Sequence, residues 1–292
     1  MKFKVAAAPI SWGVSEVPGW GRILEPDQVL SEMAGLGVHA TELGPPGYLP
    51  DPRTIIGRHG LELVGGFLAV PLHDTATADD SVARTSTAAR TIARAGGEIV
   101  VLAAATGLDG YDERPALDEE RWAVLIDTCR RVTDVVTTEG LRVAMHPHVG
   151  THVETEAEVE RFIADSRMPL CLDTGHLLVG GTDPVALAER HPDRIGHLHL
   201  KDVRADLAGA VRNGDVGFAD AVARGLFVPL GEGDVDTEAV VRSVHGAGYR
   251  GWYVLEQDTA LGPDSALGDP RRDTARSLVH LDQVFSRIQE GR

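Results

Sequence analysis

Short apolar segments and amphipathic helical segments alternate along nearly the whole of this 292-residue chain. Such alternation predicts a parallel sheet, because each crossover between parallel strands needs a connecting helix. Eight strands with eight helices predict a single closed (β/α)8 barrel, known as a TIM barrel. An open doubly wound sheet is the runner-up, but it usually has fewer strands and a glycine-rich first turn. We expect strands at 4–10, 38–43, 61–68, 98–103, 141–146, 170–173, 195–201 and 251–256, and helices at 26–36, 51–59, 77–95, 117–139, 155–165, 184–190, 237–247 and 271–289.

The segment at about 203–236 is the one long interruption of this alternation. No linker separates domains, so residues 1–292 are interpreted as one domain with this insertion. A connector of that length is seldom structureless, and we expect part of it to be helical and to cover the barrel mouth. Its glycines, in the run GLFVPLGEGDVD, suggest tight turns close to a bound ligand.

Composition narrows the class of protein. The 44 acidic residues outnumber the 28 basic ones, giving a formal net charge of −16. Such a surface repels phosphate backbones, so nucleic acid is not an expected partner. No stretch is apolar for long enough to span a membrane. The two cysteines, Cys129 and Cys171, are interpreted as buried apolar residues rather than a disulfide, which favours a reducing, cytoplasmic location.

Four of the expected strands end in side chains that commonly bind metals. They lie in LRVAMHPH, LCLDTGH, IGHLHLKD and GWYVLE. Side chains alternate between the two faces of a strand, so His146 and His148 share one face, and His199 and Lys201 share another. The active site of a parallel barrel lies at the carboxyl ends of its strands. A single polar strand end is more often structural, but agreement among four favours a mixed N/O site for a divalent metal.

The chain also carries seven ordered motifs: APISW, LSEMAGLGVHATELG, HPHVGTHVET, LDTGHLLVGG, HLHLKDVR, FVPLGEGDVD and GWYVLEQD. Together they resemble the xylose isomerase-like barrel superfamily and, within it, the inosose dehydratases of inositol catabolism. The resemblance implies an eight-stranded barrel with one divalent metal at its mouth. Mn²⁺ or Co²⁺ is the expected ion, with Mg²⁺ and Zn²⁺ as alternatives.

The resemblance also implies the ligands Asp173, His199 and Glu256. Most members of the superfamily have a glutamate as fourth ligand, where this chain has His146, with His148 two residues on. We take His146 as the ligand and leave the exchange of the two histidines open. The change removes a carboxylate that isomerases and epimerases use as a base, which puts a two-base proton shuttle in doubt.

Further polar residues are candidates for contact with a substrate. Three of them also have an alternative without a role in substrate binding or catalysis. Lys201 could form a surface salt bridge with Asp202 or Glu232, and Trp12 and His176 could have a structural role. The catalytic candidates are His148, His176, Lys201 and Glu256, and the substrate-binding candidates are Trp12, Glu42, Arg204 and Glu232.

These features together predict a metal-dependent lyase that removes water from a small neutral cyclic polyhydroxy ketone, such as an inosose. The reaction would pass through an enolate formed by loss of the proton next to the ketone. A ketose isomerase or epimerase, and a lyase that cleaves keto-glycosides by β-elimination, share that first step and stay open. A DNA-repair nuclease is disfavoured by the net charge and by too few ligands, and a non-catalytic sugar-binding protein has no need of an open metal site. The prediction allows a homo-oligomer.

Overall fold

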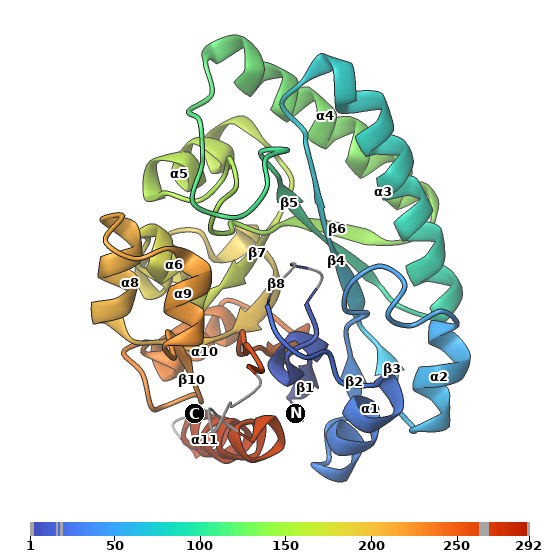
Figure 1. Cartoon of the computed structure of the whole chain (residues 1–292), viewed down its shortest axis with the longest axis vertical. Helices are drawn as coiled ribbons and strands as arrows, with labels where there is room; N and C mark the ends of the chain where they lie inside the picture. The colour runs from blue at the N-terminus through green and yellow to red at the C-terminus, as the bar shows by residue number, and fades with distance from the viewer. Residues whose placement is uncertain (1–2, 16, 18–19, 263–268, 291–292) are drawn as a thin grey trace.

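The computed structural model describes residues 3–15, 17, 20–262 and 269–290. Nine parallel strands form one sheet in the order β3-β2-β1-β11-β8-β7-β6-β5-β4 (Figure 1). Only Val64 separates β3 from β4; its N–H donates to the Thr41 carbonyl and its carbonyl accepts from the Glu98 N–H. The sheet is therefore a nearly closed barrel, with β3 and β4 standing for one predicted strand. The strands are β1 Lys4–Ala7, β2 Ala40–Thr41, β3 Glu62–Leu63, β4 Gly65–Val70, β5 Ile99–Ala104, β6 Arg142–Met145, β7 Leu170–Asp173, β8 Ile195–Leu200 and β11 Trp252–Leu255.

Helices surround the barrel, and most begin at a capping side chain that the sequence supplies. Thr155 accepts a hydrogen bond from the Glu158 N–H while the Glu158 side chain accepts from the Thr155 N–H, which confirms the predicted capping box. The main helices are α1 Pro26–Gly35, α2 Pro52–Arg58, α3 Thr75–Ala95, α4 Glu119–Thr138, α5 Glu156–Asp165, α6 Thr174–Gly180, α7 Pro184–Arg190, α10 Thr237–Gly246 and α11 Pro270–Glu290. None of the helices in the described part of the chain combines the length and apolar character that crossing a membrane requires.

Two local expectations need correction. The first strand ends at Ala7 rather than at residue 10, because Pro9 begins the short 3₁₀ helix η1 Pro9–Trp12. Helix α6 was not predicted, since its sequence TGHLLVG contains two glycines, which are poor helix formers. It begins at Asp173, whose side chain accepts from the Gly175 and His176 N–H groups.

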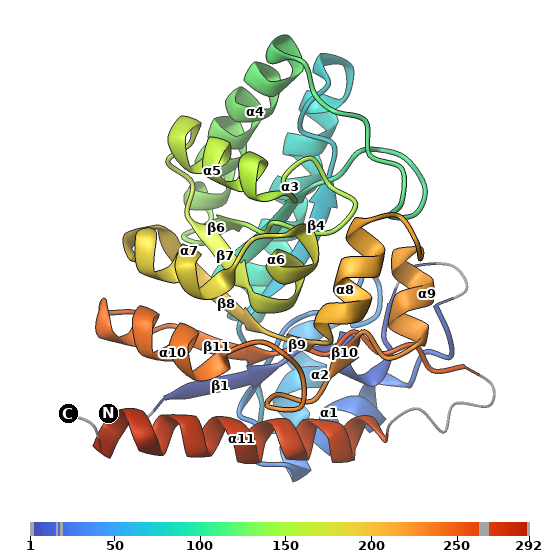
Figure 2. The same ribbon diagram turned by 90° about the vertical axis from the view of Figure 1, so that its left-hand side faces the viewer.

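The inserted segment contains the helices α8 Ala205–Arg212 and α9 Phe218–Ala223. A short antiparallel pair, β9 Asp202–Val203 with β10 Phe227–Val228, holds it together. These elements stand beside the carboxyl end of β8 (Figure 2). Their apolar side chains form a cluster with Trp20 and Val149 from the loops that follow β1 and β6. The expected partial helicity of the insertion is thereby confirmed.

The interior of the barrel is filled by an apolar cluster that combines small and large side chains. Ala6, Ala40, Ala144 and Cys171 are among the small ones, and Trp252 is the largest. The larger apolar core lies between the strands and the helices. Ala144 and Cys171 precede His146 and Asp173 by two residues, so small side chains lie beneath the imidazole and the carboxylate on the same strands.

Candidate metal centre

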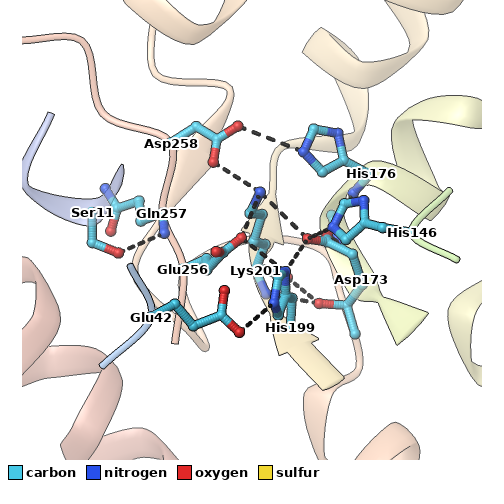
Figure 3. A network of polar contacts seen from close by, with 12 residues as sticks. Ser11, Glu42, His146, Asp173, His176, His199, Lys201, Glu256, Gln257 and Asp258 are labelled. Carbon is cyan, nitrogen blue, oxygen red and sulfur yellow. Dashed lines mark hydrogen bonds and ion pairs between the residues drawn. The ribbon is translucent and has the colours of Figure 1, made fainter. Parts of the chain in front are cut away.

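The four predicted metal ligands meet at the carboxyl ends of β6, β7, β8 and β11 (Figure 3). His146 and His199 are each 1% exposed, and Asp173 is fully buried. Each lies two residues beyond an inward-facing side chain, so strand alternation brings them to one place. Glu256 follows Val254 of β11 in the same way.

Asp173 is the central residue of this group. Its Oδ1 accepts from the Gly175 and His176 N–H groups, which leaves Oδ2 for the centre of the site. Oδ2 lies 3.2 Å from His146 Nε2 and 3.6 Å from His199 Nδ1. Nδ1 of His199 lies in turn 3.1 Å from Glu256 Oε2.

This donor set fits a divalent cation. Nδ1 of His199 is buried and, within the described part of the chain, makes no hydrogen bond of normal geometry, although a Glu256 oxygen is 3.1 Å away. Ligand atoms of Asp173, His199 and Glu256 all lie within 4.8 Å of one another. Two imidazoles with two carboxylates are ligands that Mn²⁺, Co²⁺ and Zn²⁺ accept. Among the described residues, two other groups share His199: one adds His146 and Cys171, and the other Glu42 and His197.

Lys201 extends from β8 into the same group of carboxylates. Its Nζ lies 3.3 Å from Asp173 Oδ2, 3.0 Å from Glu256 Oε2 and 2.8 Å from Asp258 Oδ1. Burial opposes the charge, but Asp173, Asp258 and Glu256 together raise the pKa of Lys201 well above its usual value. Lys201 is therefore a buried ammonium, and the alternative of a surface salt bridge with Asp202 or Glu232 is wrong.

Asp258 is a site residue that the sequence reasoning missed. It is 7% exposed, and burial raises its pKa to about 6. The available signal was its spacing: it follows Glu256 by two residues in an extended segment, so both carboxylates can face the same way. It lines the cavity beside Lys201.

The rings of His148 and His176 lie in close, tilted contact beside the metal ligands. Their ring centroids are 3.7 Å apart. His148 Nδ1 donates to the Val149 carbonyl at 2.7 Å, so Nε2 is the nitrogen that can accept a proton. Burial lowers the pKa of His148 to about 3 and that of His176 well below its usual value, which keeps both rings neutral. His148 lines the cavity, whereas His176 lies behind it, with Nε2 3.7 Å from Asp258 Oδ2.

The cavity at the barrel mouth is lined by both polar and apolar residues. The polar ones are His146, His148, His199 and Lys201 with the carboxylates of Glu42, Glu256 and Asp258. The apolar ones, called here its apolar side, include Val14, Val17, Trp20, Phe67 and Tyr111, and the rings of Phe67 and Tyr111 lie beside that of His148. A ring that carries hydroxyl groups and also has C–H bonds on its faces matches such a mixed lining.

Three of the substrate-binding candidates lie outside this cavity. Trp12 is fully buried in the core, where its Nε1 donates to Glu32 at 2.7 Å, so the expected contact with a substrate is wrong. Arg204 and Glu232 line a neighbouring depression rather than the cavity. Glu232 pairs there with Arg276 at 3.1 Å.

Glu42 does line the cavity, but its contacts differ from those expected. Its Oε1 accepts from Nε2 of His197 at 2.9 Å and from Nε2 of His199 at 3.2 Å. Burial raises the pKa of Glu42, but the two imidazoles outweigh this and lower it well below its usual value. The carboxylate is therefore ionised, and His197 is a second residue that the sequence reasoning left unassigned.

Comparisons with known proteins agree with this architecture. The family model of the xylose isomerase-like TIM barrel matches residues 33–283. The chain is 33% identical to an inosose dehydratase of Geobacillus kaustophilus, and the match covers 95% of each chain. It is 36% identical to the rhizopine catabolism protein MocC of Rhizobium meliloti, over 88% of this chain and 82% of that protein.

A solved barrel is similar in shape as well. The IOLI protein with a bound zinc atom superimposes with a TM-score of 0.71 and 16% identity, covering 98% of this chain and 99% of that one. With 16% identity, this similarity in shape bears on the fold alone.

Proposed function

Because the chain belongs to the family of xylose isomerase-like TIM barrels, we propose that it is a metal-dependent carbon–oxygen lyase that dehydrates an inosose or a closely related cyclic polyhydroxy ketone. The observation that carries this proposal is the convergence of His146, Asp173, His199 and Glu256 at the base of a cavity that a buried ammonium and a neutral imidazole also line. The match to inosose dehydratases over nearly the full chain supports the choice of substrate.

One divalent ion, Mn²⁺ or Co²⁺ in the first place and Mg²⁺ or Zn²⁺ as alternatives, would be held by His146, Asp173, His199 and Glu256. The zinc atom of the similar IOLI barrel supports a divalent ion on this fold. When bound, the ion would supply Lewis acidity to the ketone and so favour loss of the neighbouring proton.

His148 is the base in this proposal. Its Nδ1–H donates to the Val149 carbonyl and its ring packs against His176, so the ring is oriented and Nε2 accepts the proton from the carbon next to the ketone. Desolvation lowers the pKa of His148 to about 3, so its Nε2 carries no proton before the reaction. The same shift weakens the ring as a base, so acidification of the substrate proton by the ion would have to offset it.

Lys201 is the acid. Its Nζ carries a proton because three carboxylates surround it, and it gives that proton to the hydroxyl group that leaves. The substrate loses a proton to His148 and a hydroxide that the Lys201 proton converts to water. Return of the proton from His148 to Lys201 through solvent restores both groups, so the net change is the loss of one water from the substrate. Glu256 orients Lys201 in addition to its place among the metal ligands.

His146 favours elimination over the rival isomerase or epimerase. Those reactions return the proton to another carbon or another face and use a second base for it, whereas this chain has a neutral imidazole where most members of the family have a carboxylate. The apolar side of the cavity, with Trp20 and Tyr111, would pack on the ring face and exclude water.

The test is incubation of the metal-loaded protein with inosose and a panel of keto-sugars and keto-glycosides, followed by mass spectrometry. The proposal expects a product lighter by one water from inosose. A product of equal mass would indicate an isomerase or epimerase, and a cleaved glycoside would indicate the β-eliminating lyase; either result in place of dehydration contradicts the proposal.

A further inference from the structure

Glu42 follows β2, and its carboxylate reaches His199 from the side opposite Asp173 (Figure 3). Its side chain is 3% exposed. One of its oxygens, Oε1, contacts Nε2 of both His197 and His199. His199 is thus placed between two acidic groups: Nε2 faces Glu42, and Nδ1 faces Asp173 and Glu256.

The chemistry of a carboxylate decides which nitrogens carry hydrogen. An ionised carboxylate has no proton to give, so it can only accept. Both Nε2 atoms near Glu42 must therefore be protonated. For His199, in the neutral state that binds a metal, this leaves the lone pair on Nδ1, directed toward Asp173 and Glu256.

His197 serves the same arrangement from the next inward position of β8. Its Nε2 donates to Glu42 at 2.9 Å. Its Nδ1 is buried and has no hydrogen-bond partner among the residues that the structure describes. The bond to Glu42 is accordingly the one polar contact its ring makes there, and it fixes the Glu42 oxygen from a second side.

We propose that Glu42 is a positioning residue that holds His199 in the tautomer with hydrogen on Nε2 and aims Nδ1 at the metal, while His197 holds Glu42. The inference rests on the proposed metal site and gives Glu42 a role other than binding substrate hydroxyls. Carboxylates that orient ligating histidines in this way typically contribute about 10- to 100-fold to metal affinity.

The first test compares the dissociation constant for Co²⁺ in the wild type and in Glu42→Gln, measured by competition with a chelator. Glutamine keeps the shape but not the charge, so we expect affinity to fall by about 10- to 100-fold and the visible absorption of bound Co²⁺ to change. Glu32→Gln is the matched control, because the half-buried Glu32 on α1 also accepts from a ring N–H, that of Trp12. Unchanged affinity and spectrum in Glu42→Gln would overturn the proposal.

The second test needs no variant. In the Zn²⁺-loaded wild type with ¹⁵N-labelled histidine, we expect His199 to show a protonated Nε2 and a metal-bound Nδ1. A metal-bound Nε2 would overturn the assignment even if Glu42→Gln fails to fold. A wild type that binds neither Co²⁺ nor Zn²⁺ overturns the proposed metal site itself, whereas normal binding with an unaffected Glu42→Gln overturns only the role of Glu42.

Discussion

Asp173 divides its two carboxylate oxygens between the backbone and the site. Oδ1 caps α6 and Oδ2 faces His146, His199 and Lys201. Asp173→Asn keeps an oxygen for the cap but removes the charge, so we expect a folded protein with little bound metal. Elemental analysis measures this. Asp183→Asn is the control, because Asp183 caps α7 in the same way away from the site, and it should keep its metal. Full metal content in Asp173→Asn would remove Asp173 from the ligand set.

His146 is proposed as a metal ligand and His148 as the base, and variants of the two should have different effects. His148→Gln should lower kcat by about 10²- to 10⁴-fold, the usual contribution of a general base, and leave metal content unchanged. His146→Gln should instead reduce metal content. Steady-state kinetics together with elemental analysis distinguish the two effects. If His148→Gln loses the metal while His146→Gln retains it, the two roles are exchanged.

Strand alternation explains which of these residues the sequence could predict. His146, Asp173, His199 and Glu256 each end a regular strand, so their direction follows from the alternation alone. Trp12 was placed wrongly because it lies in a 3₁₀ turn, where alternation gives no guidance. The contacts of Glu42 with His197 and His199 join residues 155 and 157 positions apart, and only the closed barrel brings them together.

Among the elements, α5 depends on its capping box. Glu158 accepts from the Thr155 N–H and pairs with Arg114 at 2.7 Å. Burial raises the pKa of Glu158, but these two contacts outweigh the effect of burial and lower the pKa below the usual 4.5. A lowered folded pKa means that the stabilisation is complete above 4.5 and is lost as the pH falls through the folded value.

Glu158→Gln should therefore lower the free energy of unfolding by about 1 kcal/mol at neutral pH. The difference from wild type should shrink well below pH 4.5. Urea unfolding at the two pH values measures it, with the exposed Glu156→Gln in the same first turn as control. A difference that does not change with pH would contradict the assigned role.

The loop 229–236 is organised around Asp202. Asp202 accepts hydrogen bonds from the Val203, Gly231, Gly233 and Val235 N–H groups. A Cβ on Gly233 would stand 2.3 Å from Asp202 Oδ1, which explains the glycine. These tight turns wrap a buried carboxylate of the chain itself, and residues 229–236 do not line the cavity at the barrel mouth. That they lie close to a bound ligand stays a prediction.

Asp202→Ala would leave several N–H groups without an acceptor. We expect a loss of about 3 kcal/mol or more in the free energy of unfolding, because each buried unsatisfied group costs about 1–3 kcal/mol. Hydrogen exchange at 229–236 should increase in the same variant. Asp206→Ala, on the exposed surface of α8, is the control. Unchanged exchange in the loop would show that Asp202 does not organise it.

For the helices and strands, the sequence predicted the alternating elements because the spacing of their apolar residues was clear. It did not predict α6, whose helical form depends on the Asp173 cap and on burial rather than on propensity. It also joined β3 and β4 into one strand, since the interruption at Val64 involves one residue without a turn signal.

For the whole molecule, the barrel core is independent of the metal ligands. The large core cluster lies between the strands and the surrounding helices. Lys201 partly neutralises the acidic residues at the mouth of the barrel. Removal of metal by a chelator should therefore abolish activity and leave far-ultraviolet circular dichroism unchanged, with activity restored best by Mn²⁺ or Co²⁺. Loss of the fold in chelator would indicate a structural metal instead.

The class of fold could be predicted because strand-like and helix-like segments alternate along the chain. The metal site could be predicted because four of the expected strands end in side chains that commonly bind metals. The choice of substrate depends on the apolar side of the cavity, where loops from distant parts of the chain meet, such as those with Trp20 and Tyr111. Oligomeric state and cellular location stay predictions.

The most direct measurement is the rate of water loss from inosose as a function of bound divalent metal, starting from metal-free protein. The account predicts no dehydration without metal and a rate that rises in proportion to loading until one ion is bound per chain. Full dehydration by the metal-free protein, or no loss of water at any loading, would contradict it.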